Sequence, residues 1–169
     1  MTDSLPHVVN VKNQWLFDQV EVEFPTPESL RGRTVYQSLW ERSSVSSFIP
    51  ADKTSKIDSQ DIYLVDFHRL TVMFSLLQAT RADNEQDQND LVEFFTQIIF
   101  SEPCRLYVGF YQATPVAAAI VTEFEGQLLV SDIVIKSPQV HGSKEEFVTS
   151  VISKLNGERS IESKVYIEL

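Results

Sequence analysis

The sequence has one cysteine and only five glycines in 169 residues, and it contains no long apolar run. The single thiol, Cys104, excludes an internal disulfide and a cluster of cysteine ligands. It fits a reducing compartment, so we expect a cytoplasmic protein. No segment approaches the roughly 20 apolar residues that cross a bilayer, and residues 1–15 lack the basic and apolar regions of a signal peptide. Export and membrane insertion are therefore not expected.

Basic residues are also scarce. Fourteen lysines and arginines stand against 24 aspartates and glutamates, which gives a formal net charge of -10. Affinity for nucleic acids comes mainly from lysine and arginine, so binding to DNA or RNA is not expected. An acidic surface serves solubility in most such domains, and it also attracts cationic amines.

Other recognisable chemistry is missing as well. His7, His68 and His141 are too dispersed for a metal site, so no metal is expected. The sequence holds neither a GxxxxGK[ST] phosphate loop nor a GxSxG nucleophile elbow. Cys104 at the start of a β-rich run is typical of a small core residue rather than a nucleophile.

What the sequence does have is enough apolar material for a core, since hydrophobic residues make up 43% of the chain. Small polar residues dominate residues 43–60 (SSVSSFIPADKTSKIDSQ), which indicates a long connection or an insert. We therefore predict an N-terminal extension over residues 1–60 and a core domain over residues 61–169.

The extension contains weak signals for secondary structure. Imperfect alternation over residues 14–24 predicts a half-buried strand, and residues 7–11 predict a second short strand. Thr26 followed by Pro27 predicts the start of a helix. That helix carries Leu30, Val35, Leu39 and Trp40, and Gly32 weakens its prediction.

The core domain has a clearer pattern. Residues 62–67 predict a short strand, and apolar residues at helical spacing from 67 to 77 predict a helix after it. Residues 81–90 (RADNEQDQND) predict a solvated connection, and residues 91–99 predict a second amphipathic helix. Three β-rich runs at residues 104–111, 115–124 and 127–136 predict an antiparallel meander, because only short turns join them.

A capped helix and a last strand complete the core domain. Ser143 and Glu146 have the spacing of a capping box, and an apolar stripe follows them. Asn156 and Gly157 predict a left-handed cap at the end of this helix. Residues 164–169 predict the last strand.

From residue 60 on, this order of elements resembles the GNAT family of acyl-CoA N-acyltransferases over about two thirds of the chain. The resemblance implies an α/β fold of the α+β type, with a mixed, mainly antiparallel sheet flanked by helices. In that family, the loop after the fourth strand reads Arg or Gln, two free positions, Gly, one free position, then Gly or Ala. Residues 139–144 (QVHGSK) occupy that place, with Gln139 and Gly142 matching and Lys144 departing.

By this resemblance, the backbone N–H groups of the loop hold the pyrophosphate of acetyl-CoA or another acyl-CoA, because a helix N-terminus offers free donors. A lysine at position 144 either blocks close approach of the backbone or offers its ammonium to a phosphate. Ser143, Glu145 and Glu146 compete with an anion, so an ordinary capped helix is an open alternative. The predicted loop residues are Gln139, Val140, His141, Gly142, Ser143 and Lys144.

The resemblance also implies that the strand at residues 128–135 offers backbone groups to the pantetheine arm, where it diverges from the strand at 164–169. Ile133, Val134 and Ile135 suit that role, and they suit a buried strand equally. Acyl transfer to an amine needs a base and an acid. The candidate bases are Glu123, Glu125 and Asp132, and the candidate acid is Tyr166.

The family pattern continues past the fifth strand with a helix and two more strands, whereas this sequence ends at Leu169. We hypothesise that residues 7–24 replace those strands, or that a partner subunit in a homodimer supplies them, because an open strand edge invites aggregation. Two functions stay open. One is an acyl-CoA-dependent N-acyltransferase acting on an unidentified amine, and the other is a non-catalytic interaction or regulatory protein of the same fold.

Overall fold

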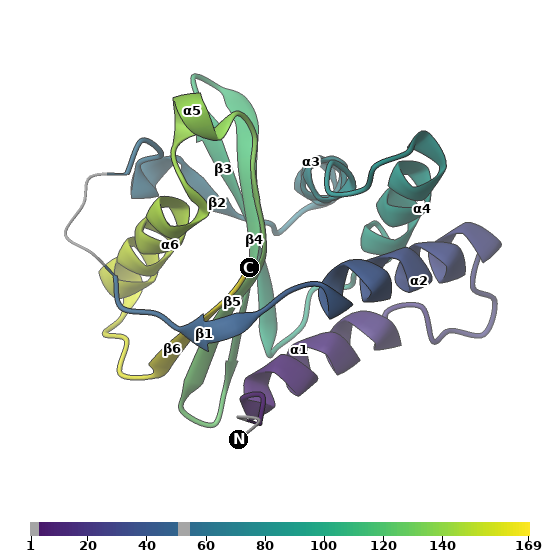
Figure 1. Cartoon of the computed structure of the whole chain (residues 1–169), viewed down its shortest axis with the longest axis horizontal. Coiled ribbons are helices and arrows are strands. Elements are labelled where there is room, and N and C mark those ends of the chain that lie inside the picture. Colours follow the sequence, from purple (N-terminus) through teal and green to yellow (C-terminus); the bar gives the residue numbers. More distant parts are fainter. Residues whose placement is uncertain (1–3, 51–54) are drawn as a thin grey trace.

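The computed structural model describes residues 4–50 and 55–169. Over these residues, six strands form one sheet in the order β1-β6-β5-β4-β3-β2 (Figure 1). Neighbouring strands run antiparallel except for β5 and β6, which are parallel. The predicted class, a mixed and mainly antiparallel sheet with flanking helices, is confirmed. The strands are β1 (Val45–Ser47), β2 (Ile62–Leu64), β3 (Cys104–Tyr111), β4 (Thr114–Phe124), β5 (Gln127–Ile135) and β6 (Lys164–Glu168).

Helices lie on both sides of this sheet. Figure 1 shows α6 on one side and α1 to α4 on the other, with the short α5 where β5 ends. One apolar cluster packs between the sheet and helices α1 to α4, and a second packs between the sheet and α6. The helices are α1 (His7–Asp18), α2 (Pro27–Glu41), α3 (His68–Ala79), α4 (Glu85–Phe95), α5 (Pro138–His141) and α6 (Lys144–Glu158), and a 3-10 turn covers Ser59–Asp61.

The predicted meander of β3, β4 and β5 is confirmed. Two-residue turns join the strands at residues 112–113 and 125–126, and φ is positive at all four positions. Positive φ at both turn residues is the pattern of type I′ turns, whose twist matches that of the strands they connect. The middle of the sheet is therefore specified by local sequence.

The N-terminal segment is a helix, so the two strands predicted within residues 7–24 are wrong. The buried positions of α1 recur at helical spacing, and this stripe packs against β4 and β5. Lys12 and Asn13 lie on the buried side and interrupt the apolar pattern, which is why alternation fitted the sequence as well as a helical period. The stripe consists of Val8, Val9, Lys12, Asn13, Trp15 and Leu16.

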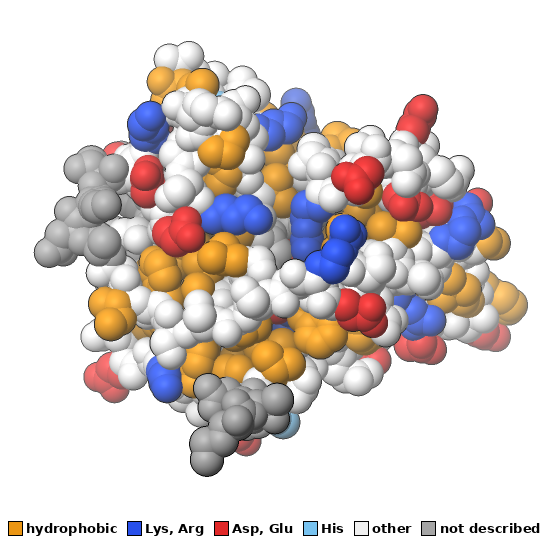
Figure 2. Space-filling model, in the orientation of Figure 1, with side chains coloured by type: hydrophobic (Ala, Val, Ile, Leu, Met, Phe, Trp, Pro, Cys, Tyr) orange, Lys and Arg blue, Asp and Glu red, His pale blue; other side chains and the backbone are white. Residues whose placement is uncertain are grey.

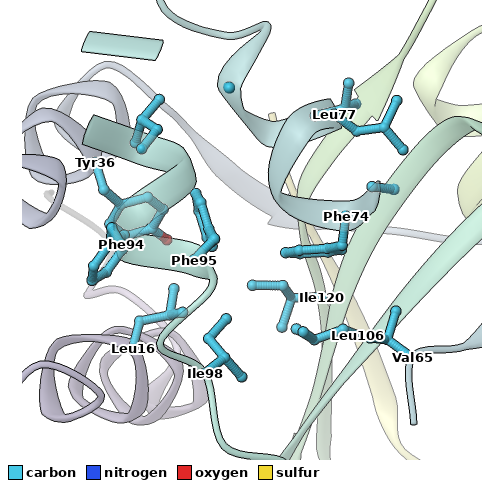
Figure 3. Close-up of a cluster of buried hydrophobic side chains, with 14 of the residues drawn as sticks. Leu16, Tyr36, Val65, Phe74, Leu77, Phe94, Phe95, Ile98, Leu106 and Ile120 are labelled. Atoms are coloured by element: carbon cyan, nitrogen blue, oxygen red, sulfur yellow. The ribbon is translucent and has the colours of Figure 1, made fainter. Parts of the chain in front are cut away.

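Helix α2 begins where the sequence predicts. The Thr26 hydroxyl accepts a hydrogen bond of 3.1 Å from the Ser29 amide, and Pro27 is the first helical residue. Gly32 is a point of close contact, because a Cβ there would lie 2.0 Å from the carbonyl oxygen of Asp90 in α4. The backbones of α2 and α4 thus approach each other directly, and Figure 3 shows the aromatic side chains of Tyr36, Phe94 and Phe95 gathered in the adjoining core.

The predicted connection at residues 43–60 contains a short strand. In β1, Val45 lies opposite Glu168 and Ser47 lies opposite Tyr166. The N-terminal part of the chain therefore covers the outer edge of β6 as hypothesised, but with residues 45–47 rather than 7–24. Residues 51–54 of the connection lie outside the described residues. The homodimer and the boundary between residues 60 and 61 stay predictions.

Helices α3 and α4 are both present, but the connection between them is shorter than predicted. Asn84 caps α4, since its side-chain oxygen accepts a hydrogen bond of 2.9 Å from the Asp87 amide. Residues 85–90 are therefore helical rather than a solvated loop. Asp90 is buried and accepts a hydrogen bond of 3.2 Å from Arg31, so this carboxylate ties α4 to α2.

Helix α6 starts as predicted and ends differently. The Ser143 hydroxyl accepts a hydrogen bond of 3.1 Å from the Glu146 amide, which confirms the cap. The predicted left-handed C-cap is wrong, because Gly157 is helical and the chain becomes extended at Arg159. Asn156 instead accepts a hydrogen bond from the Ile161 amide, which fixes the path into β6.

Candidate functional site

The parallel pair of β5 and β6 separates partway along β5. Pairing runs from Gln127 opposite Lys164 to Val130 opposite Ile167, and β6 ends one residue later. β5 continues to Ile135, so its second half lacks β6 as a neighbour. Backbone groups on this edge can bind another partner, because every strand edge carries unpaired N–H and C=O groups. The Asp132 carbonyl is an exception, since it accepts a hydrogen bond of 2.6 Å from the Gln78 side chain.

A bulge in β5 marks the point of separation. Asp132 has a positive φ of 53°, and the register with β4 shifts between Ala118 and Ile120. An extra residue on one strand bends it and turns a side chain in a new direction. Here the bulge turns the Asp132 side chain toward α1 and the end of α3, where Lys12 and Arg81 contact it.

The three residues predicted to lie along the cofactor continue β5 beyond the bulge. Ile133 and Ile135 belong to the apolar cluster under α6, whereas Val134 belongs to the cluster on the opposite face. Their side chains therefore pack into the two apolar clusters on opposite faces of the sheet. A ligand in the gap, by which we mean the stretch beside β5 beyond Val130 where β6 no longer pairs with it, would have to contact their backbone.

The predicted phosphate loop forms a turn of helix followed by a cap. The amides of Val140 and His141 donate to the carbonyl of Ser137, and the Gly142 amide donates to that of Pro138. These three amides are thus already bonded within α5. At the start of α6, the Ser143 hydroxyl accepts a hydrogen bond from the Glu146 amide. Within the described part of the chain, the first-turn amides at positions 144 and 145 are left for another partner.

Gly142 lies in contact with the carboxylate of Glu146. Its φ is 95°, and a Cβ added there would lie 2.4 Å from Oε2 of Glu146. The Glu146 side chain therefore lies against Gly142, at the N-terminus of the same helix. A negative charge at this position is favourable for the helix dipole, and it would repel a phosphate. A phosphate can bind the loop only if Glu146 turns away.

Two cations face this region from different elements. Partial burial and the positive charge of Arg81 both lower the pKa of Lys144, against the opposing effect of Glu145. Arg81, which follows α3, is 20% exposed and donates to Asp132 at 3.0 Å. Figure 2 shows Lys and Arg side chains near the centre of this face of the molecule. An anion in the gap would therefore meet positive charge at both Lys144 and Arg81.

A buried ionic cluster lies just beyond the last paired residues of β5 and β6, on the side of the sheet that α1 covers. The Lys12 ammonium lies 2.7 Å from the Tyr36 hydroxyl, 2.9 Å from Oε1 of Glu168 and 3.2 Å from Oδ2 of Asp132. The side chains of Lys12 and Asp132 are fully buried, and that of Glu168 is 2% exposed. Four elements, α1, α2, β5 and β6, therefore meet at one ammonium group.

The two carboxylates of this cluster have opposite pKa shifts. Burial alone would raise the pKa of Asp132, but the charges of Lys12 and Arg81 and the hydrogen bond from Ser131 hold it below its usual value. Burial and the charge of Asp132 raise the pKa of Glu168, against the effect of Lys12. Asp132 is therefore the ionised partner of Lys12, and Glu168 is the carboxyl that takes up a proton more readily.

The predicted catalytic residues do not lie together. Glu123 on β4 pairs with Arg159, beside a hollow of about 260 Å³ that Glu102 and Arg105 also line. Its cross-strand neighbour is residue 128, so Asp132 lies four residues further along β5, about 13 Å away at strand spacing. Tyr166 is half-buried on β6, with the Lys164 ammonium 5.3 Å from its ring centre. Glu125 lies exposed in a turn.

The sequence prediction missed Lys12, Tyr36, Arg81 and Glu168. One signal for Lys12 was present, because it falls within the stripe of α1 once residues 7–18 are taken as a helix. A charged residue in the middle of an apolar stripe predicts a buried partner. No comparable signal marks Glu168, which alternates with apolar residues as an exposed strand residue would.

Other candidate groups are structural. Cys104 is buried beside the Thr122 hydroxyl at 3.2 Å, and burial raises the pKa of its thiol to about 12, so it is not a reactive thiolate. Among the described residues, no group of three or more His, Cys, Asp or Glu side chains is arranged to hold a metal ion. Over the same part of the chain, no helix has the length and apolar character needed to cross a membrane.

Comparison of the structure with solved structures finds distant similarity. No protein-family model matches the sequence, and no curated protein matches it. The structure is similar to a solved GCN5-related N-acetyltransferase from Kribbella flavida, with 9% sequence identity and a TM-score of 0.47. The match covers 75% of this chain and 47% of that chain, so the present chain spans about half the length of its structural neighbour. Such a distant likeness says nothing about the activity of this chain.

Proposed function

We propose that this chain is a cytoplasmic acyl-CoA-binding, N-acyltransferase-like protein that transfers an acetyl or longer acyl group to an amine. The observation that carries this proposal is the separation of β5 from β6. Pairing stops at Val130 and Ile167, and β5 runs on toward the N-terminus of α6. A strand with a free edge that leads to a helix N-terminus suits an extended ligand with an anionic end.

The anionic end is proposed to bind at the loop that follows β5. The suitable groups are the free first-turn amides at positions 144 and 145 and the ammonium of Lys144, with Arg81 adding positive charge. The residues proposed to hold the pyrophosphate are Gln139, Val140, His141, Gly142, Ser143 and Lys144. The backbone of Ile133, Val134 and Ile135 is proposed to hold the arm that joins it to the acyl group. Bound acyl-CoA supplies the activated thioester.

The acceptor amine must lose a proton during transfer. Among the predicted bases, Asp132 lies at the gap, but its lowered pKa makes it a weak base. Its neighbour Glu168, whose pKa is raised, is better suited to take the proton. Glu123 and Tyr166 lie farther from the gap, and their proposed roles are tested by Glu123→Gln and Tyr166→Phe in an acyl-transfer assay.

Calorimetric titration with acetyl-CoA and with CoA tests the cofactor. We expect saturable binding at or below millimolar ligand, weakened by Lys144→Ala. The matched control is Lys154→Ala on the same helix, ten residues and about 15 Å further along, which should leave the affinity unchanged. Absence of binding at millimolar ligand would remove the cofactor from the proposal.

A second function is favoured by the contacts within the loop. The amides of Val140, His141 and Gly142 are bonded internally, and Glu146 lies against Gly142. These contacts are those of a closed structural loop, so the alternative is a non-catalytic GNAT-fold protein that serves interaction or regulation. Acyl transfer to any amine of a panel, lost when Gly142→Val disrupts the loop, would rule out this alternative.

A further inference from the structure

The oxygen atoms around the Lys12 ammonium match in number the N–H donors of a protonated primary amine. A protonated primary amine has three N–H donors and no acceptor. Lys12 has three oxygen partners within 3.2 Å, one each from Tyr36, Glu168 and Asp132. The ammonium also lies 5.4 Å from the centre of the Tyr36 ring, where the aromatic face attracts a cation.

The two carboxylates among these partners are held in place by groups outside α1. Asp132 is fixed by Arg81 at 3.0 Å and by the Ser131 hydroxyl at 2.7 Å. The second carboxylate oxygen of Glu168 accepts a hydrogen bond of 3.2 Å from the indole of Trp40. Because these contacts do not involve Lys12, we expect the carboxylates of Asp132 and Glu168 to stay near their positions when the lysine side chain is absent.

We infer that Asp132, Glu168 and Tyr36 form a receptor for a primary ammonium group, which Lys12 of α1 occupies within the same chain. The receptor selects a ligand that has three N–H donors on one positively charged nitrogen. A quaternary ammonium has no N–H to donate, and an alcohol of the same length has no charge.

The position of the receptor connects it with the acceptor of the proposed reaction. It lies at the end of the β5–β6 pairing, beside the gap to which the acyl group is assigned. The following assignment rests on the proposed function. The acceptor is a primary alkylamine, and the Lys12 ammonium occupies the binding position of that amine while α1 is packed on the sheet. The receptor itself does not depend on acyl transfer.

The experiment removes the internal occupant and replaces it with a free amine. Lys12→Ala deletes three methylene groups and the ammonium, which n-propylammonium restores atom for atom. The variant leaves two buried carboxylates without their cation, so we expect its Tm to fall by roughly 10 °C. Added n-propylammonium should recover a large part of that loss, in a concentration-dependent manner.

Three controls separate the receptor from general salt effects. Tetramethylammonium and n-propanol at equal concentration should not raise the Tm of Lys12→Ala. Lys12→Met fills the same space without charge and should not respond to n-propylammonium, and neither should the wild type. A Tm of folded Lys12→Ala that n-propylammonium leaves no higher than the controls do would overturn the inference.

A variant that does not fold by itself still gives an answer. Refolding of Lys12→Ala is then carried out with each additive, and recovery of native circular dichroism with n-propylammonium alone supports the receptor. Recovery with none of the additives, or with all of them equally, overturns it. Thiol release from acetyl-CoA in the presence of n-propylamine is measured in parallel. Stabilisation without thiol release supports the receptor and counts against acyl transfer only.

Discussion

Helices α1 and α6 pack on opposite faces of the same sheet and use different chemistry. The contact of α6 is apolar, with Val148, Val151 and Leu155 fully buried in one cluster. The contact of α1 includes a lysine held between two carboxylates. Apolar burial is non-directional, whereas the ionic contact holds only while all its oxygens stay within reach of one ammonium.

The difference concerns specificity more than net stability. Removing charges from water costs several kcal/mol per ion, so a buried ion pair contributes little overall and still breaks at high cost when one partner is removed. The α1 face should therefore respond strongly to loss of a single charge. The α6 face should respond in proportion to the apolar volume that is lost.

The largest effect is expected from Asp132→Ala. This change leaves Lys12 and Arg81 as two buried or half-buried cations without a shared carboxylate, and we expect a loss of about 3–5 kcal/mol in the free energy of unfolding. Urea denaturation at pH 7 measures it. The matched control is Glu123→Ala on the neighbouring strand, whose pair with Arg159 is partly exposed and should contribute at most about 1 kcal/mol. Equal losses in the two variants would contradict the distinction between them.

Leu155→Ala tests the apolar face and should rank second. Its side chain is fully buried under α6, so truncation should cost about 2–4 kcal/mol. The cost should be the same in 0.05 and about 1 M sodium chloride after correction for the wild type, because no charge is involved. A clear salt dependence of the difference between Leu155→Ala and wild type would show that the two faces are not held as described.

The same contrast explains what the sequence could predict. The meander, α3, the start of α6 and β6 follow from periodicity, short turns and a cap, all of which act between residues close in sequence. The prediction of α1 failed because Lys12 and Asn13 interrupt its apolar stripe, and the partners of Lys12 lie on distant elements. Gly32 weakened the prediction of α2 for a similar reason. Only the close approach of the α4 backbone at Asp90, which is distant in sequence, makes a glycine favourable there.

The candidate site divides in the same way. A loop motif was enough to predict residues 139–144 as a candidate site, because the residues that would bind a phosphate are contiguous. The ammonium receptor joins Lys12 to Glu168 across 156 positions. Its geometry depends on β1 pairing with β6 and on the bulge at Asp132, neither of which has a local signature. Packing of distant segments therefore decides the part of the site that the sequence did not show.

A smaller effect with a defined pH dependence is expected from Glu168→Gln. Because the pKa of Glu168 is raised above its ordinary 4.5, the native state binds this proton more tightly than the unfolded state. That contribution to stability is complete below pH 4.5 and is lost as pH rises through the raised pKa. The pKa of Asp132 is lowered, so its contribution is present above 3.8 and lost as pH falls, in wild type and variant alike.

The measurement for this variant is a series of urea midpoints. Glutamine keeps an acceptor for Lys12 and loses the charge, so the difference from wild type at pH 7 should stay within about 1 kcal/mol. The difference should move in favour of Glu168→Gln as pH rises from about 4 to 7. A shift in the opposite direction would mean that Glu168, not Asp132, is the permanently charged partner of Lys12.

The smallest effect concerns the start of α6, where the Glu146 carboxylate lies at the N-terminus of the helix. Glu146→Gln removes the carboxylate that lies against Gly142 and should cost only about 0.3–1 kcal/mol of stability, because a negative charge near a helix N-terminus is favourable. The same change should raise the affinity for acetyl-CoA in a calorimetric titration, since it removes repulsion of the phosphates. Glu145→Gln changes the net charge equally one residue earlier, and it should raise the affinity less. Equal gains in the two variants would indicate a general effect of net charge, and the contact between Glu146 and Gly142 would then have no special role in keeping phosphate out of the loop.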